Sequence, residues 1–168
     1  MHNQYALAPI TAGLITALAS FMGSILRPLG GFLADKFGGV RMLTFLLTCI
    51  GLVYAVASSL PILVVMSGLF VIGMSCLGMG NGAVFQLVPQ RFRTEIGVAT
   101  GIVGAFGGLG GFLLPTMLGN VKQLSGSYGP GLVLLSLCAF GALILLRVLV
   151  ALQKGWRFSW RAAQVAEG

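Results

Sequence analysis

An arginine inside an apolar segment is the residue of this sequence with the clearest capacity for chemistry. Arg27 follows a long apolar run and precedes the next charged residues by roughly two helical turns, which buries it about 10 Å into hydrocarbon if the segment spans a membrane. That burial costs about 2.5 kcal/mol or more. A guanidinium stays protonated and can donate two parallel N–H bonds to an oxyanion. We therefore expect Arg27 to face an aqueous cavity and bind an anion.

Two simpler explanations of Arg27 stay open. The side chain could reach the cytoplasmic interface, or a carboxylate on another helix could neutralise it. The second is difficult within this chain, because the acidic residues Asp35, Glu95 and Glu167 all lie at or beyond the ends of apolar segments.

Two amides and an aromatic ring occur together in a later apolar segment, in the run from Gly80 to Gln86. Asn81 and Phe85 share a helix face at the i, i+4 spacing. An amide can donate to an oxyanion, and a ring can cover a flat ligand, so these residues are candidates for the same anion site. The alternative is that the amides join helices and Phe85 packs in the core.

A third pattern is a glycine face in the following segment. Five of its members recur at alternating spacings of four and three, and they are Gly97, Gly101, Gly104, Gly108 and Gly111, while Gly107 and Gly110 widen the face. Small residues at this spacing let a neighbouring backbone approach closely. So long a face favours a helix that slides against a partner or lines a narrow passage.

Enzymatic chemistry is not expected. The single histidine, His2, stands at the N-terminus, and the glycine-rich stretch lacks the ending of a phosphate-binding loop. The cysteines Cys49, Cys76 and Cys138 stand alone in apolar stretches, without metal-ligand spacing, and we expect them to be small core residues. No metal or cofactor is predicted.

The composition requires that these residues be positioned by helices in lipid. Of 168 residues, 57% are hydrophobic and only 8% are charged, with a mean hydropathy of +1.01. A soluble domain has about 25% charged residues. We predict an all-α, polytopic membrane protein with a partial bundle over residues 1–151 and a cytoplasmic tail over 152–168. The five predicted transmembrane spans are 8–33, 42–59, 62–88, 97–118 and 130–151.

The connections between spans differ in charge. Seven basic residues flank the spans on one side, and Lys122 alone lies on the other. Cytoplasmic loops retain Lys and Arg, which explains the net charge of +7 without nucleic acid. The rule predicts an outside N-terminus and a cytoplasmic C-terminus in a cell (plasma or inner) membrane. An odd number of spans that starts outside suggests a chain lacking its beginning.

The run from Gly31 to Arg41 resembles the signature loop of the major facilitator superfamily, with Gly39 and Val40 in place of part of the usual basic run. Within that superfamily, three motifs in order, the runs 26–31 and 80–86 and the glycine-rich stretch 101–112, make the chain similar to the nitrate/nitrite porter family. The resemblance covers nearly the whole chain and corresponds to helices 8–12 of such a transporter.

The resemblance implies roles for particular residues. Arg27 would be one of two arginines that clamp the anion, Phe85 would pack against it, and the face with Gly104, Gly107 and Gly108 would approach the substrate and move. Asp35, with Lys36 and Arg41, would hold the cytoplasmic gate through basic groups and a helix N-terminus.

The expected function is therefore nitrate or nitrite transport by alternating access, with this chain as a C-terminal fragment whose partner, the N-terminal half, is absent. Two alternatives remain: a truncated product that inserts in the membrane without transport, and part of a carrier for another anion, such as a carboxylate or phosphate.

Overall fold

The structure is a computed structural model that describes residues 8–152, and the predicted tail lies almost entirely outside the described residues. Those residues form six helices and no strand. The helices are α2 (Pro9–Ile25), α3 (Arg27–Phe37), α4 (Gly39–Ala57), α5 (Leu63–Arg91), α6 (Ile96–Ser125) and α7 (Gly129–Leu152). Five stretches are long and apolar enough to cross a membrane, with α2 and α3 together forming the first. The predicted all-α, multi-pass class is confirmed.

The first apolar stretch is broken at Leu26, between α2 and α3. Pro28 is among the first residues of α3, and a proline there has no N–H to donate to the carbonyl four residues earlier. The chain continues as a second helix that starts at Arg27. The predicted span 8–33 runs through this break, which Pro28 signals in the sequence.

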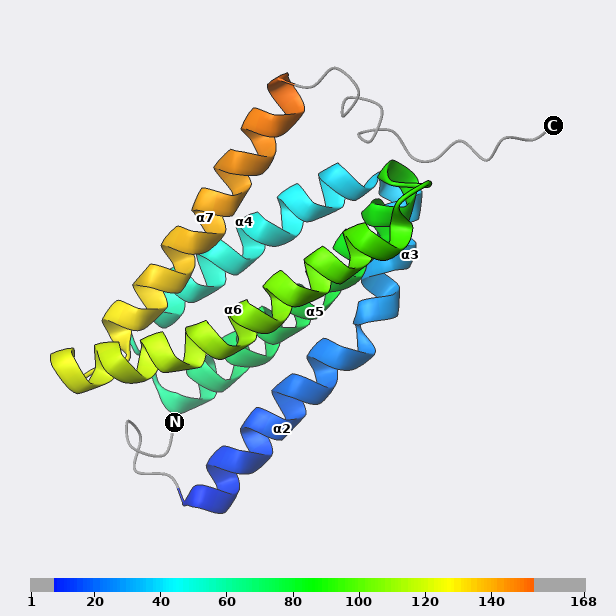
Figure 1. The fold of residues 1–168 in the computed structure, drawn as a ribbon. Helices are drawn as coiled ribbons and strands as arrows, with labels where there is room; N and C mark the ends of the chain where they lie inside the picture. The colour runs from blue at the N-terminus through cyan, green and yellow to red at the C-terminus, as the bar shows by residue number, and fades with distance from the viewer. Residues whose placement is uncertain (1–7, 153–168) are drawn as a thin grey trace.

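Five of the helices stand side by side, in the order α2 with α3, then α5, then α4, then α7 (Figure 1). The α6 helix crosses one face of this array and touches mainly α7 and α5. The core lies between α4, α5 and α7, where Leu46, Ile50 and Tyr54 of α4 are buried. This order leaves α6 as the least enclosed helix.

Glycines allow α2 and α3 to lie directly against α5. A Cβ on Gly78 would overlap the carbonyl of Gly23, and one on Gly82 would overlap the carbonyl of Arg27. Gly30 is equally tight against the backbone of Met79. The obstacles are backbone atoms, which cannot rotate away as a side chain can. Close approach therefore requires glycine at these positions.

The α4–α7 contact combines a glycine with a buried hydrogen bond. The ring of Phe140 lies over Gly51, where a Cβ would come within 2.8 Å of it. The Ser136 hydroxyl donates to the carbonyl of Gly51 at 2.7 Å. Since Ser136 is buried, its hydroxyl needs a partner inside the protein. This bond fixes α7 on α4.

No residue of α6 is buried in the described chain. Large apolar side chains point outward along its length, including Phe106 and Phe112, each 71% exposed. The helix runs unbroken through Pro115 to Ser125, beyond the predicted span end at residue 118. Within residues 8–152, its contacts with α7 and α5 leave most of its surface exposed.

Candidate functional site

Arg27 is the first residue of α3, and its side chain is exposed. The break at Leu26 places it where one helix ends and another begins within the same membrane-crossing stretch. No described carboxylate forms an ion pair with it. Its backbone carbonyl lies against Gly82 of α5, so Arg27 is held at a fixed height along that helix.

The structure brings Asn81 and Phe85 close to the same level. Both flank Gly82 on α5, and both side chains are exposed, Phe85 by 39%. Neither is packed into the core, which was the alternative for Phe85. The backbone contact at Gly82 thus sets a guanidinium, an amide and a ring on neighbouring turns of adjacent helices. Such groups can bind a small anion by charge and hydrogen bonding.

Gln86 joins two helices, which was the alternative given for the amides of this motif. Its amide donates to Oδ1 of Asp35, and Gln90 donates to the same oxygen at 3.1 Å. Among the described residues, no basic side chain forms an ion pair with Asp35. The carboxylate thus ties the end of α3 to α5 through two neutral donors that the sequence analysis did not identify as its partners.

The loop proposed to hold the gate is largely helical. Asp35 and Lys36 belong to the last turn of α3, and Arg41 belongs to the first turn of α4. Only Gly38 separates the helices, with a φ of 93° that favours glycine. The Lys36 ammonium lies 5.8 Å from the centre of the Phe37 ring. The three charges are consequently fixed by helices rather than by a mobile loop.

The glycines predicted to approach the substrate face open space. A Cβ on Gly104, Gly107 or Gly108 would meet nothing within 4 Å. The α6 helix is also not among the helices that pack closely against α2 or α3. In this chain the structure therefore does not join the glycine face to Arg27.

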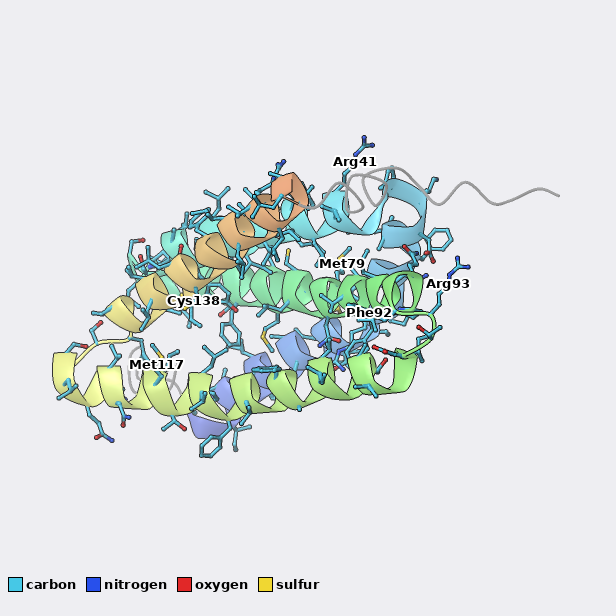
Figure 2. All side chains as sticks on the ribbon, turned by 45° about the horizontal axis from the view of Figure 1, so that its top comes forward. Arg41, Met79, Phe92, Arg93, Met117 and Cys138 are labelled. Atoms are coloured by element: carbon cyan, nitrogen blue, oxygen red, sulfur yellow. The ribbon has the colours of Figure 1, made fainter. Side chains whose placement is uncertain are left out.

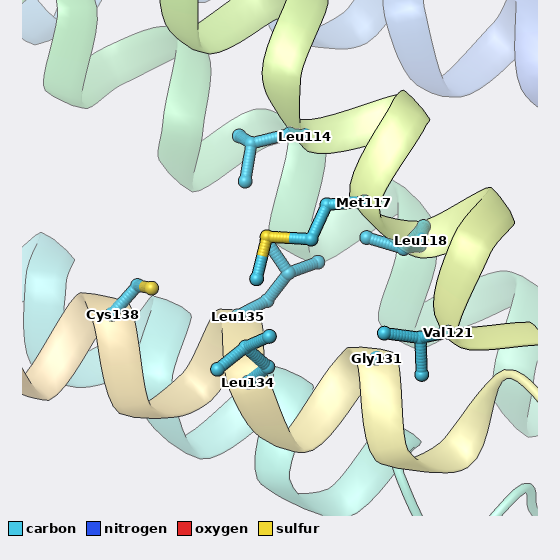
Figure 3. A pocket seen from close by; sticks show the side chains of 8 residues that line it. All are labelled: Leu114, Met117, Leu118, Val121, Gly131, Leu134, Leu135 and Cys138. Carbon is cyan, nitrogen blue, oxygen red and sulfur yellow. The ribbon is translucent and has the colours of Figure 1, made fainter. Parts of the chain in front are cut away.

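An open apolar groove of about 610 Å³ lies between α4, α5, α6 and α7. No charged residue lines it, so it is unsuited to an anion. A smaller pocket beside it lies between α6 and α7, lined by Met117 and Leu118 of α6 and by Leu135 and Cys138 of α7 (Figure 3). Cys138 is exposed, so the expectation that all three cysteines are core residues is wrong for this one.

A second arginine lies within an apolar helix and is not among the predicted site residues. Arg147 lies in α7, about one turn and a half before its described end, and its side chain is exposed. That distance is short enough for the side chain to reach the interface. Among the described residues, no group of three metal-ligating side chains comes together.

The family described as "Major Facilitator Superfamily" matches residues 1–115. Three relatives carry related names. The "Nitrite extrusion protein" of Bacillus subtilis is 41% identical over 147 residues. Proteins named "Probable nitrate transporter NarT" are 38% identical over 146 residues in Staphylococcus carnosus and 35% identical over 144 in Staphylococcus haemolyticus.

The match covers most of this chain but little of each relative. It includes 84–85% of the chain and 36% of the length of each of the three proteins. No solved structure matches the chain. These names confirm the resemblance to nitrate and nitrite porters inferred from the three motifs.

Proposed function

Because the chain belongs to the major facilitator superfamily, we propose that it supplies transmembrane helices to a transporter for nitrate or nitrite. The helices correspond to the C-terminal part of the transporter, helices 8–12, and an N-terminal half supplies the others. Transport proceeds by alternating access, in which two helical bundles rock around a midplane anion site. No bond is made or broken, in keeping with a family of transporters rather than enzymes.

The exposed position of Arg27 at the start of a half-helix carries this proposal. Broken membrane helices are typical of transporter binding sites. The guanidinium forms one side of an anion clamp, Asn81 donates a hydrogen bond, and the Phe85 ring covers one face of a planar anion. A second arginine from the other half closes the clamp. Gly104, Gly107 and Gly108 move against that half.

The charges at one end of the bundle support a cytoplasmic location for that end in the plasma or inner membrane. Arg41 and Arg93 project there from α4 and from the connection between α5 and α6 (Figure 2). The positive-inside rule places such residues in the cytoplasm, with the start of α2 outside. Asp35, Lys36 and Arg41 then form the cytoplasmic gate.

Uptake of labelled anions tests the proposal, in cells that lack other nitrate carriers and produce the chain joined to the missing half. We expect Arg27→Lys to reduce nitrate or nitrite uptake roughly tenfold or more, because lysine cannot donate the paired bonds. Arg147→Lys is the matched control, as it changes an arginine in another span. Unchanged uptake in Arg27→Lys would refute the anion clamp, and uptake of only phosphate or a carboxylate would favour the other carrier.

A second candidate is a truncated product that inserts in the membrane without transport. The exposure of most of α6 favours it, because no residue of this helix is buried and within residues 8–152 it touches mainly α5 and α7, along limited stretches. The DNA upstream of Met1 distinguishes the two. An in-frame extension encoding seven further spans supports the transporter, whereas its absence supports the truncated product.

A further inference from the structure

A groove of about 450 Å³ lies between α3 and α4, at the end of the bundle where the two helices join. Leu33 and Phe37 of α3 line one wall, and Met42 and Phe45 of α4 line the other. Met79 of α5 contributes to the lining from beneath them. The volume falls within the roughly 300–1,000 Å³ of small-molecule sites. Phe37 and Phe45 are 52% and 64% exposed, so the groove opens to the outside of the bundle.

Positive charge is concentrated at one end of this groove. Arg41 lines it directly, and the Lys36 ammonium stands over the edge formed by Phe37. Arg41 is in the first turn of α4, which has no side-chain cap. The positive end of the helix dipole and N–H groups without helical partners therefore add to the two side-chain charges.

The carboxylate of Asp35 lies on the side of α3 away from the groove. Asp35 lies two residues from both Leu33 and Phe37, which places it on the opposite face of α3. Its carboxylate is engaged there by Gln86 and Gln90 of α5. The groove thus combines an apolar channel with a cationic end and contains no acidic lining residue.

We propose that this groove binds an anionic phospholipid of the surrounding membrane. The phosphate lies between Lys36, Arg41 and the start of α4, and an acyl chain follows Phe37 and Phe45 toward Met79. A lipid fits this combination because the groove begins at the end of two membrane-crossing helices and continues along their apolar sides. Basic pockets between helices at the cytoplasmic side are typical sites for anionic headgroups.

The test uses the full chain in bilayer discs of phosphatidylcholine with an equal share of phosphatidylglycerol, with retained lipid counted by native mass spectrometry. We expect preferential retention of phosphatidylglycerol. Each basic residue contributes about fivefold, so the double variant Lys36→Gln/Arg41→Gln should lose roughly twenty-five-fold of the preference. Arg93→Gln is the matched control, because it removes a charge from the same end of the bundle outside the groove.

Two further measurements distinguish a lipid from other ligands. Leu33→Trp should fill the apolar channel and lower retention while both charges remain. Millimolar inorganic phosphate should not displace the lipid from the unmodified chain. The proposal is overturned if the unmodified chain shows no preference, if Arg93→Gln loses as much as the double variant, or if phosphate alone displaces the lipid.

Discussion

Two glycine-rich regions of this molecule look alike in sequence and behave differently in the structure. Where α2 and α3 contact α5, Gly30, Gly78 and Gly82 press against backbone atoms of the opposing helix. Along α6, Gly104 and Gly108 repeat at helical spacing, yet a Cβ on either would touch nothing. Glycine spacing shows that a helix can accept a close neighbour. It does not show whether this chain provides one.

The largest expected effect on stability comes from adding a methyl group where α5 contacts α2. Gly78→Ala should lower the free energy of unfolding by about 3 kcal/mol, because the new methyl group overlaps the carbonyl of Gly23 and one helix must move. Thermal or denaturant unfolding in detergent micelles measures this. Gly80→Ala is the control. Gly80 lies on the same helix as Gly78, and a Cβ there would meet nothing within 4 Å. Equal stabilities would mean that α2 and α5 are not in contact.

A smaller loss is expected from the polar end of the same interface. Gln86→Ala removes a half-buried donor to the Asp35 carboxylate and should cost about 1.5 kcal/mol in the same unfolding assay. Gln90→Ala should stay within about 0.5 kcal/mol, because its bond to the same oxygen is exposed. A larger loss of stability for Gln90→Ala than for Gln86→Ala would show that Gln90 is the main hydrogen-bond partner of Asp35.

The open glycine face should respond with the opposite sign. Gly104→Ala should raise the stability of this chain by up to about 1 kcal/mol, because alanine favours the helix and meets no neighbour. Uptake by the joined transporter should fall if this face meets the other half. A loss of stability in the chain alone would instead reveal a contact on α6.

The smallest effect is expected where α6 meets α7. A Cβ on Gly131 would lie 3.3 Å from Cγ of Leu118, a side chain that can shift slightly. Gly131→Ala should therefore change the unfolding free energy by less than about 0.5 kcal/mol, since mild crowding offsets the gain in helix propensity. A cost above 2 kcal/mol would place α6 closer to α7 than described.

Much of the candidate site could be predicted from the sequence, because a charged residue in an apolar segment is rare and its burial costs free energy. Arg27, Asn81 and Phe85 were found by type and spacing, and the structure leaves all three exposed on adjacent helices. For Gln86 the alternative is confirmed, namely that the amide joins two helices, but its place in the motif did not indicate which neighbour it faces. Its partner, Asp35, is 51 residues away in the chain.

The sequence by itself determined the helical, membrane-spanning character of this protein, since apolar length and sparse charge leave no alternative in lipid. It also determined which residues could bind an anion. Only the tertiary structure decided which glycines pack against another helix, where the first span breaks and which side chains donate hydrogen bonds to Asp35. Those outcomes depend on contacts between distant segments, and hydropathy and spacing describe each segment alone.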